Sequence, residues 1–312
     1  MPEDDPWPAL PYAEWADTCE TLHLWSQILG KLRLSQTPWL NHSWQTPLYV
    51  SARGLTSGII AHSQHVFDLE LDFVDHVLRM RTDEREALIV LQAGPVAAFF
   101  AQVMDGLAGL GVPVRINAAP NEMPSATPFS KDIAPRVYEP LHAERFWRVL
   151  LRADRVLKTF RTGFLGKASP VHFFWGSFDL AVTRFSGRAA PRHPGGVPHL
   201  PDAVAREAYS HEVSSAGFWP GGPGDQDAAF YSYAWPEPVG YRDATPAPRE
   251  ARFDAALGEF VLPYEAVRSA ADPEGALMAF LSSTYAAAAD LGLWDRAALE
   301  CELGAPGRPR PT

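Results

Sequence analysis

Apolar residues recur every third or fourth position near the start of the chain, which is the spacing of one helix face. Within residues 12–34 this face carries Trp15, Leu22, Trp25 and Leu29, so we expect a long amphipathic helix there. Helices are also predicted for other segments, of which the last is short: residues 95–110, 142–166, 273–291 and 293–303.

Alternation of apolar and polar residues elsewhere predicts half-buried strands. It is clearest where Phe67, Leu69 and Leu71 alternate with acidic residues. Residues 86–92 (EALIVLQ) predict the next strand, and the short polar link before them permits an antiparallel hairpin. Residues 112–117 (VPVRIN) predict another strand.

The second half of the chain holds three strand-like runs rich in aromatic and polar side chains: residues 169–188 (SPVHFFWGSFDLAVTRFSGR), 207–219 and 229–236. The link between the last two is rich in glycine and proline and predicts a hairpin. Strands that follow each other closely pair antiparallel more readily than they cross over. We therefore predict an α+β fold, with mainly antiparallel sheet flanked by long amphipathic helices.

The chain is long enough for one large domain. Its 312 residues are 46% hydrophobic, which suffices for a sizeable core in one unit or in two closely packed halves. We predict a single compact domain over residues 1–303, whose halves would be residues 7–120 and 136–303. A disordered tail is expected at residues 304–312.

Charge and cysteine content limit the partners and the cellular location that we expect for the protein. A formal net charge of −10 leaves no excess of Lys and Arg to neutralise phosphates, so we expect no nucleic-acid or anionic-membrane partner. Cys19 and Cys301 lie near opposite ends, which excludes a CxxC metal site. No apolar segment reaches the ~18–20 residues of a membrane span, and the acidic start is unlike a signal peptide. We expect a cytoplasmic protein.

Common catalytic motifs are absent from the sequence, including GxGxxG, the Walker A loop, HExxH and GxSxG. Candidate chemistry therefore rests on the three aromatic-rich runs. If the first run forms one regular strand, alternation places His172 and Arg184 on one face and Trp175 and Asp179 on the other. A bulge at Gly176 would shift that register.

The two following runs bring further polar and aromatic groups. Alternation places His211 and Glu212 on opposite faces of the second run, and Tyr231, Tyr233 and Trp235 on one face of the third. Three such neighbouring strands would surround a cavity with imidazole, carboxylate, phenol and indole groups, a composition suited to small ligands.

Each candidate group also has a structural explanation. His172 fits a core histidine that is hydrogen-bonded to a carbonyl or hydroxyl group. Asp179 and Arg184 fit a structural ion pair, or hydrogen bonds to loop backbone. The aromatic residues fit core positions and cavity walls equally well. Both explanations remain open for every one of these residues.

Five segments resemble the signature blocks of a bacterial family, the domain of unknown function family 5996. They are WPALPYAEWADTCETLHLWSQILGKLRL, PLYVSARGLTSG, SPVHFFWGSFDLAVTRFSGR, EAYSHEVSSAGFWPGG and FYSYAWPEP. The resemblance spans nearly the whole chain, from about Trp7 to Leu303, and implies one full-length domain. It implies no particular activity, cofactor or partner.

These patterns favour a small-molecule enzyme whose pocket lies over the sheet formed by the three runs. In a metal-assisted version, His172, His211 and Glu212 bind a divalent ion (non-haem iron, zinc or copper), with Asp179 as a fourth candidate ligand. In a metal-free version, His211 or Glu212 is the general base and Arg184 holds an anionic substrate.

The remaining candidates complete the predicted site. Tyr233 is a further catalytic candidate, and the residues expected to contact the substrate are Trp175, Asp179, Trp219, Tyr231 and Trp235. The alternative function, from a different class, is a ligand-binding or regulatory protein without turnover.

Overall fold

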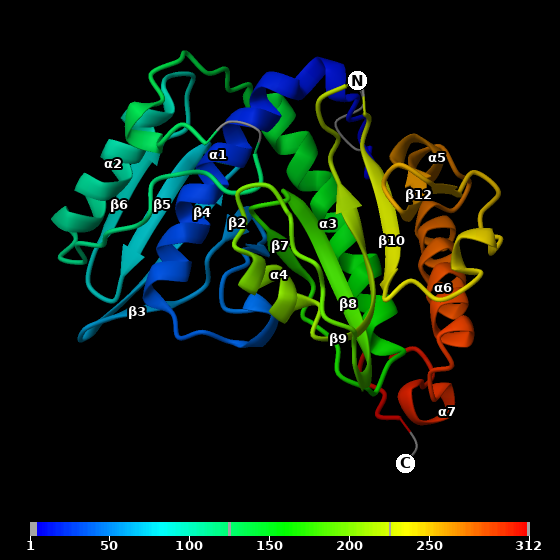
Figure 1. Ribbon diagram of the computed structural model, residues 1–312. Coiled ribbons are helices and arrows are strands. Elements are labelled where there is room, and N and C mark those ends of the chain that lie inside the picture. The colour runs from blue at the N-terminus through cyan, green and yellow to red at the C-terminus, as the bar shows by residue number, and fades with distance from the viewer. Residues whose placement is uncertain (1–4, 124–125, 225, 311–312) are drawn as a thin grey trace.

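A computed structural model describes residues 5–123, 126–224 and 226–310 of the chain (Figure 1). Its helices are α1 (Tyr12–Gln36), α2 (Val96–Gly109), α3 (Pro140–Thr162), α4 (Asp202–Ala208), α5 (Tyr264–Arg268), α6 (Pro273–Leu291) and α7 (Arg296–Leu299). Short 3-10 helices are η1 (Asn41–Ser43), η2 (Phe129–Lys131) and η3 (Tyr241–Asp243). The long helices predicted from apolar spacing are thus confirmed as α1, α2, α3 and α6.

The strands form two antiparallel sheets, which confirms the α+β class. The first sheet contains β1 (Tyr49–Val50), β2 (Gly54–Thr56), β3 (Ile60–His62), β4 (His65–Asp72), β5 (Val77–Thr82) and β6 (Glu86–Val90). The second contains β7 (His172–Phe174), β8 (Asp179–Ala189), β9 (His211–Trp219), β10 (Ala229–Trp235), β11 (Arg252–Asp254) and β12 (Glu259–Pro263).

The first sheet has the order β1-β2-β4-β5-β6, with β3 paired to β4. One face carries the apolar side chains of the alternating pattern, including Leu69 and Leu78, and is covered by α1 and α2 (Figure 1). The other face carries ion pairs such as Arg79 with the buried carboxylate of Asp72 at 2.9 Å.

Two details of the first half differ from the predictions. The segment before residue 86 contains an additional strand, β5, so the hairpin joins β5 to β6 instead of β4 to β6. The strand predicted at residues 112–117 is wrong, because this segment pairs with no strand of the described residues. Val112 and Val114 are buried against the core, so packing alone accounts for the alternation.

The second sheet has the order β11-β12-β10-β9-β8-β7. The predicted hairpin between the second and third aromatic-rich runs is confirmed as the β9–β10 pair, and β8 is the next neighbour of β9. The two sheets meet where Leu48 and Phe173 exchange backbone hydrogen bonds of 2.9 and 2.7 Å.

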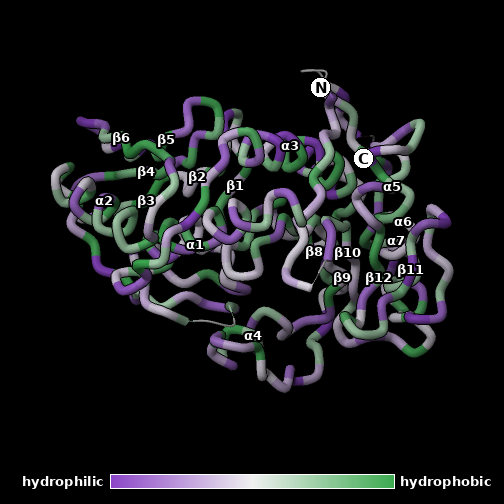
Figure 2. The backbone as a smooth tube through the Cα atoms, turned by 90° about the horizontal axis from the view of Figure 1, so that it is seen from above, coloured by the Kyte–Doolittle hydropathy of each residue, from purple (hydrophilic) through white to green (hydrophobic). Residues whose placement is uncertain are grey.

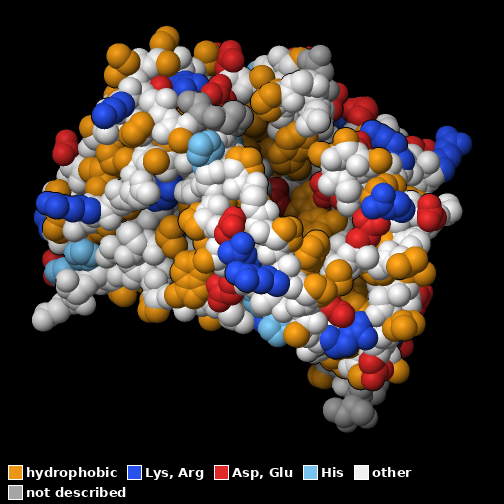
Figure 3. Space-filling view, in the orientation of Figure 1, with side chains coloured by type: hydrophobic (Ala, Val, Ile, Leu, Met, Phe, Trp, Pro, Cys, Tyr) orange, Lys and Arg blue, Asp and Glu red, His pale blue; other side chains and the backbone are white. Residues whose placement is uncertain are grey.

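Helices cover the two faces of the second sheet unequally. Helices α3 and α6 pack along one face, whereas the short helix α4 lies on the opposite side of β8, β9 and β10 (Figure 2). In the space-filling view the surface is hollowed in front of this sheet, with hydrophobic side chains inside and acidic side chains beside them (Figure 3). The face away from α3 and α6 is therefore the one that holds a cavity.

The predicted tail is described up to Arg310, whose guanidinium donates to the carbonyl of Glu302 at 3.0 Å; residues 311 and 312 lie outside the described residues. No helix in the described ranges combines the length and apolarity that crossing a bilayer requires.

Candidate functional site

The first aromatic-rich run is a hairpin and not one strand. Strand β7 ends at Phe174, four residues make the turn, and β8 begins at Asp179, so that Phe174 pairs with Asp179 and His172 with Ala181. Directly paired residues share a sheet face. His172 therefore lies on the same face as Asp179, and the predicted pairing of His172 with Arg184 on one face is wrong.

The registers of the next two strands place their polar groups on this same face. Thr183 of β8 pairs with Ser215 of β9, which in turn pairs with Tyr233 of β10. Tyr231, two residues away on β10, shares that face. These strands form the floor of a cavity of about 500 Å³.

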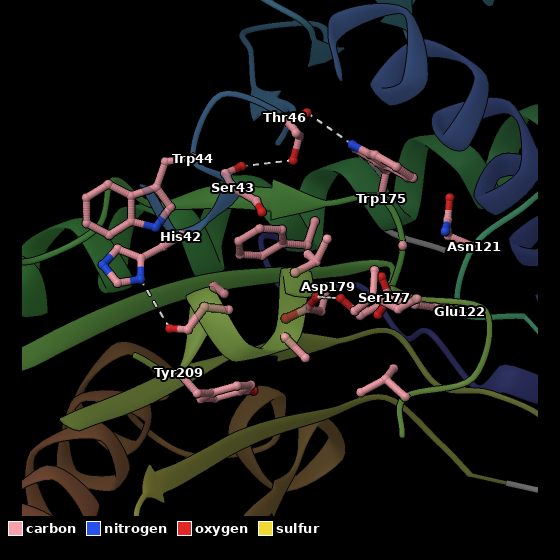
Figure 4. A pocket seen from close by; sticks show the side chains of 18 of the residues that line it. His42, Ser43, Trp44, Thr46, Asn121, Glu122, Trp175, Ser177, Asp179 and Tyr209 are labelled. Carbon is pink, nitrogen blue, oxygen red and sulfur yellow. Dashed lines mark hydrogen bonds between the residues drawn. The ribbon is translucent and has the colours of Figure 1, made fainter. Parts of the chain in front are cut away.

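The walls of the cavity come from segments far apart in the sequence. Helix α1 contributes Lys31, the segment around η1 contributes His42 and Trp44, and the long connection after α2 contributes Asn121 and Glu122. Figure 4 shows Asp179, Ser177 and Glu122 together on one side of the cavity, with His42 and Trp44 on the other. The further aromatic lining residues are Trp39, Phe174, Trp175, Phe185, Tyr209, Tyr231 and Tyr233.

Two acidic side chains form the polar centre of the cavity. The carboxylate of Asp179 accepts hydrogen bonds from the Ser177 hydroxyl at 2.5 Å and from the Tyr231 phenol. The side chain of Glu122 makes no hydrogen bond or ion pair with the described residues. No basic side chain of the described residues forms an ion pair with either carboxyl group.

The turn between β7 and β8 makes room for Glu122. A β-carbon at Gly176 would lie 2.0 Å from Oε1 of Glu122, so a residue with a side chain at this position would displace the carboxyl group. Glycine is therefore needed at this position for the close approach of Glu122 to the turn.

Burial favours the protonated form of these acids. Burial, and next to it the charge of Asp179, raise the pKa of Glu122 to about 7. Burial also raises the pKa of Asp179, although the hydrogen bonds from Ser177 and Tyr231 oppose that rise. On neighbouring β12, burial followed by the charge of Asp179 raises the pKa of Glu259 to about 7. Near neutral pH the site can therefore both hold and release protons.

A network around Asn121 fixes the wall beside Glu122. Gln27 of α1 donates to the Asn121 carbonyl at 2.8 Å and accepts from its backbone N–H at 2.7 Å. The Asn121 side chain accepts from the ammonium of Lys31 through Oδ1 and donates through Nδ2 to the carbonyl of His199 at 2.6 Å. One asparagine thus connects α1, the cavity wall and the segment above the cavity.

His42 lies at the opposite end of the cavity, next to Lys167. Nδ1 of His42 lies 3.1 and 3.2 Å from the carbonyl oxygens of Glu207 and Ala208, and Nε2 lies 2.6 Å from Nζ of Lys167. This environment fits a neutral imidazole that donates through Nδ1–H and accepts from the ammonium through Nε2. Burial, and next to it the charge of Lys167, lower the pKa of His42.

Residues 190–210, which connect β8 to β9 and contain α4, cover the cavity, and we call them the cover. Its lining side chains are mostly apolar: Val197, Leu200, Pro201, Val204, Ala205, Ala208 and Tyr209. Beyond the hydrogen bonds to His42 and Asn121, the cover is held by Glu207, which accepts from the Trp39 indole at 2.6 Å. Polar contacts therefore hold its rim, and apolar side chains face the cavity.

Strained backbone conformations gather around the same cavity. Non-glycine residues with left-handed φ angles near +60° that lie at the cavity or border it are His42, Ser43, Glu122, Phe178 and His199. Each such conformation costs about 1–3 kcal/mol and persists only where the surrounding structure enforces it. Functional sites are where such strain is commonly found.

The structure places four of the predicted site residues on the cavity. Trp175, Asp179, Tyr231 and Tyr233 all line it. Trp175 is anchored by its indole N–H, which donates to the carbonyl of Thr46 at 3.0 Å. Tyr233 meets Tyr209 at 2.9 Å between hydroxyl oxygens. Trp219 and Trp235 share this face of the sheet but do not line the cavity, and the indole of Trp235 packs on Tyr209 and His193.

Arg184 lies away from the cavity, so its predicted role in holding an anionic substrate is wrong. Its guanidinium stacks 3.5 Å from the centroid of the Phe160 ring, 4.3 Å from that of Tyr285, and donates to the Phe160 carbonyl at 2.5 Å. Phe160 belongs to α3 and Tyr285 to α6, on the helix-covered face. His172 and Arg184 are an even number of positions apart, which would place both on one face of a single strand, but the hairpin turn at residues 175–178 puts them on opposite faces.

The predicted metal ligands do not converge. Glu212 points to the other face of β9, where it accepts hydrogen bonds from Ser186 at 2.8 Å and Arg188 at 2.9 Å. His172 is fully buried among aromatic rings, and neither ring nitrogen has a hydrogen-bond partner among the described residues. His211 instead contacts Ser210 and lies 6.0 Å, between ring centroids, from His42. The predicted metal centre at these residues is therefore wrong, as are the general-base roles, because His211 and Glu212 do not line the cavity.

A wider search of the described residues finds no group of three His, Cys, Asp or Glu side chains that could hold a metal ion. Burial lowers the pKa of His172 to about 3, which keeps its imidazole neutral. The predicted hydrogen bond of a core histidine is also absent among these residues.

Sequence reasoning missed Lys31, His42, Asn121 and Glu122. Asn121 and Glu122 lie in a proline-rich connection, and Lys31 is a basic residue near Arg33 in the apolar α1 pattern. No motif or periodicity marks these four residues, because their proximity depends on how α1 and two irregular segments pack on the second sheet.

A known protein family matches almost the same range of residues as the fold described above. The sequence profile described as "Family of unknown function (DUF5996)" matches residues 7–301, which is nearly the whole chain. The chain belongs to this family. No curated protein and no solved structure matches the chain. Membership of DUF5996 thus confirms the resemblance of the five sequence segments and leaves the chemistry to be argued from the cavity.

Proposed function

We propose that this DUF5996 protein is an enzyme that acts on a small organic molecule inside the covered cavity. The observation that carries the proposal is the acid pair of Glu122 and Asp179. Glu122 is half-buried and has no hydrogen-bond or ion-pair partner among the described residues, whereas Asp179 is buried and accepts hydrogen bonds from Tyr231 and Ser177. A structural carboxyl group would gain stability from a basic partner, and none is present here.

The two acids suit different steps of one proton transfer. Glu122 has no hydrogen-bond donor that favours its ionised form, so it is the proposed general acid. Asp179 accepts two hydrogen bonds that favour its ionised form, so it is the proposed general base or charge stabiliser. Pairs of carboxyl groups with pKa values pushed apart by their environments commonly divide the work in this way.

The cavity walls suit an organic substrate. A volume of about 500 Å³ and a lining dominated by aromatic rings are typical of sites for small molecules. The cover lies over the cavity and Asp179 on its floor is buried, which strengthens electrostatic interactions at that carboxyl group. A cytoplasmic location belongs to the same proposal, and it is supported by two free cysteines and a net charge of −10.

The test compares wild-type protein with Glu122→Gln and Asp179→Asn in a mixture of cellular metabolites, followed by untargeted mass spectrometry. We expect wild-type protein to consume at least one metabolite, and each variant to do so at least 100-fold more slowly. Glu84→Gln, which changes an exposed carboxyl group far from the cavity, is the matched control.

A second candidate is a ligand-binding protein without turnover, which the aromatic walls and the firmly held cover also support. In that case a metabolite would be retained by wild-type protein and recovered unchanged. That result, with no metabolite consumed, would contradict the enzyme proposal.

A further inference from the structure

Lys31 is a buried amine on the cavity wall. It is 5% exposed, whereas the other three lysines of the chain, Lys131, Lys158 and Lys167, are exposed. The ammonium of Lys31 makes no ion pair with the described residues; its hydrogen-bond acceptor is the neutral side-chain amide of Asn121. Nζ also lies 5.6 Å from the centroid of the Trp175 ring.

A buried lysine without a carboxylate partner favours its neutral form. Burial lowers the pKa of Lys31 to about 8, so roughly one molecule in ten carries the free amine at pH 7. The neutral amine is the form that attacks a carbonyl carbon, and desolvation is a known way in which proteins activate lysine for this reaction.

The surroundings also hold the amine in place. Asn121 is clamped by two hydrogen bonds to Gln27, one turn before Lys31 on the same helix. The next residue, Glu122, supplies an acid at the same wall of the cavity. The contact between α1 and residues 121–122 thus places the Lys31 amine and the Glu122 acid on the same wall of the aromatic-lined cavity.

From this placement we propose that Lys31 forms a Schiff base with an aldehyde or ketone substrate. This inference rests on the proposed enzymatic function and names the class of its substrate. His42 lies at the opposite end of the cavity, where it would face the part of the substrate remote from the carbonyl group.

The reaction requires no oxidant or reductant. Nζ of Lys31 attacks the carbonyl carbon, a C–N bond forms, and the carbonyl oxygen takes the proton of Glu122. The resulting carboxylate removes one proton from the new ammonium group and returns it to the hydroxyl group, which leaves as water. The nitrogen lone pair completes a C=N bond, and the protonated imine remains beside the Glu122 carboxylate.

The test is reductive trapping on the full chain. Protein at pH 7 is treated with benzaldehyde and sodium cyanoborohydride, and the labelled lysines are located by peptide mass mapping over time. We expect Lys31 to be labelled at least tenfold faster than the exposed Lys131 and Lys158. Glu122→Gln should slow labelling of Lys31 about tenfold and leave Lys131 unchanged, because Lys31 lines the same cavity as this acid and Lys131 does not.

Lys31→Arg is the control for assignment, since it removes the label at this position and keeps a positive charge. Labelling of Lys31 at or below the rate of Lys131 and Lys158 would overturn the inference. If that happens while Glu122→Gln still abolishes metabolite consumption, the substrate class is wrong and the enzyme proposal stands. If Lys31 is labelled preferentially and no metabolite is consumed, the carbonyl site stands and the enzyme proposal fails.

Discussion

The phenol of Tyr231 donates a hydrogen bond to the carboxyl group of Asp179 from two strands away. Tyr231 lies on β10 and Asp179 on β8, so the phenol must reach across β9. Gly217 of β9 makes this possible, because a β-carbon there would lie 2.5 Å from the Tyr231 hydroxyl oxygen. The absence of a side chain at Gly217 thus allows the hydrogen bond that joins Tyr231 to Asp179 across the floor of the cavity.

Tyr231→Phe is expected to raise the pKa of Asp179 further. The phenol hydrogen bond favours the ionised carboxylate, and its removal leaves Ser177 as the remaining side-chain donor. The free energy of unfolding should fall by about 1–2 kcal/mol, as measured by urea denaturation at pH 7. Tyr241→Phe is the control, since its hydroxyl makes only a 3.5 Å hydrogen bond; equal losses in both variants would contradict the prediction.

Glu122→Gln is expected to stabilise the protein at pH 8. The pKa of Glu122 is about 7 in the folded protein, above the ordinary value of 4.5. The folded state therefore binds this proton more tightly, and its contribution to stability is full below about pH 4.5 and is lost as pH rises through 7. Glutamine cannot lose a proton, so the variant should gain ~1–3 kcal/mol at pH 8 relative to its difference from wild type at pH 4.5.

The measurement for Glu122→Gln is the unfolding free energy of variant and wild type between pH 4.5 and 8. A pH dependence that the substitution leaves unchanged would show that Glu122 titrates normally. Functional sites typically contain residues that are needed for activity but whose replacement stabilises the protein.

Gly176→Ala is expected to disrupt the site more than the fold. The added methyl group would meet the Glu122 carboxyl group at 2.0 Å, and the side chain of Glu122 must move away. We expect metabolite consumption to fall at least tenfold with a loss of no more than about 2 kcal/mol in stability, a typical range for a single substitution. Unchanged consumption would mean that the position of Glu122 does not matter.

Arg184→Ala is expected to act on stability alone. The buried guanidinium fills the space between α3, α6 and β8, and its removal should cost about 3 kcal/mol or more in unfolding free energy. Arg184→Met, which keeps most of the volume, should cost less. Ligand binding per folded molecule should be unchanged in both variants; a selective loss of binding by Arg184→Met would restore a functional role for this residue.

Much of the fold could be predicted because local patterns determine it. The apolar spacing of α1, α3 and α6 and the alternation of β4 reflect burial on one face, and the β9–β10 hairpin follows from its glycine-rich turn. A buried segment that pairs with no strand shows the same apolar alternation as a true strand, which is why the pattern at residues 112–117 predicts a strand.

The site was predicted only in part, and the reason is geometric. Tyr231 and Tyr233 share a sheet face through strand alternation, which a sequence displays directly, whereas Asp179 joins them through the register of β8, β9 and β10, which a sequence does not display. The turn at residues 175–178 reverses the chain and places His172 and Arg184, which alternation along one strand predicts on the same face, on opposite faces of the sheet. Lys31 and Glu122 reach the cavity through tertiary packing, which neither the hydrophobic periodicity nor any sequence motif predicts.

The cover connects two neighbouring antiparallel strands, β8 and β9. A link of two to five residues is enough to join such strands, so the sheet itself does not require residues 190–210. Chain length at this point is free to change without altering the floor that carries Asp179 and Tyr231. The outer wall of the cavity can therefore change, in evolution or by engineering, through exchange of one loop while the sheet beneath it is kept.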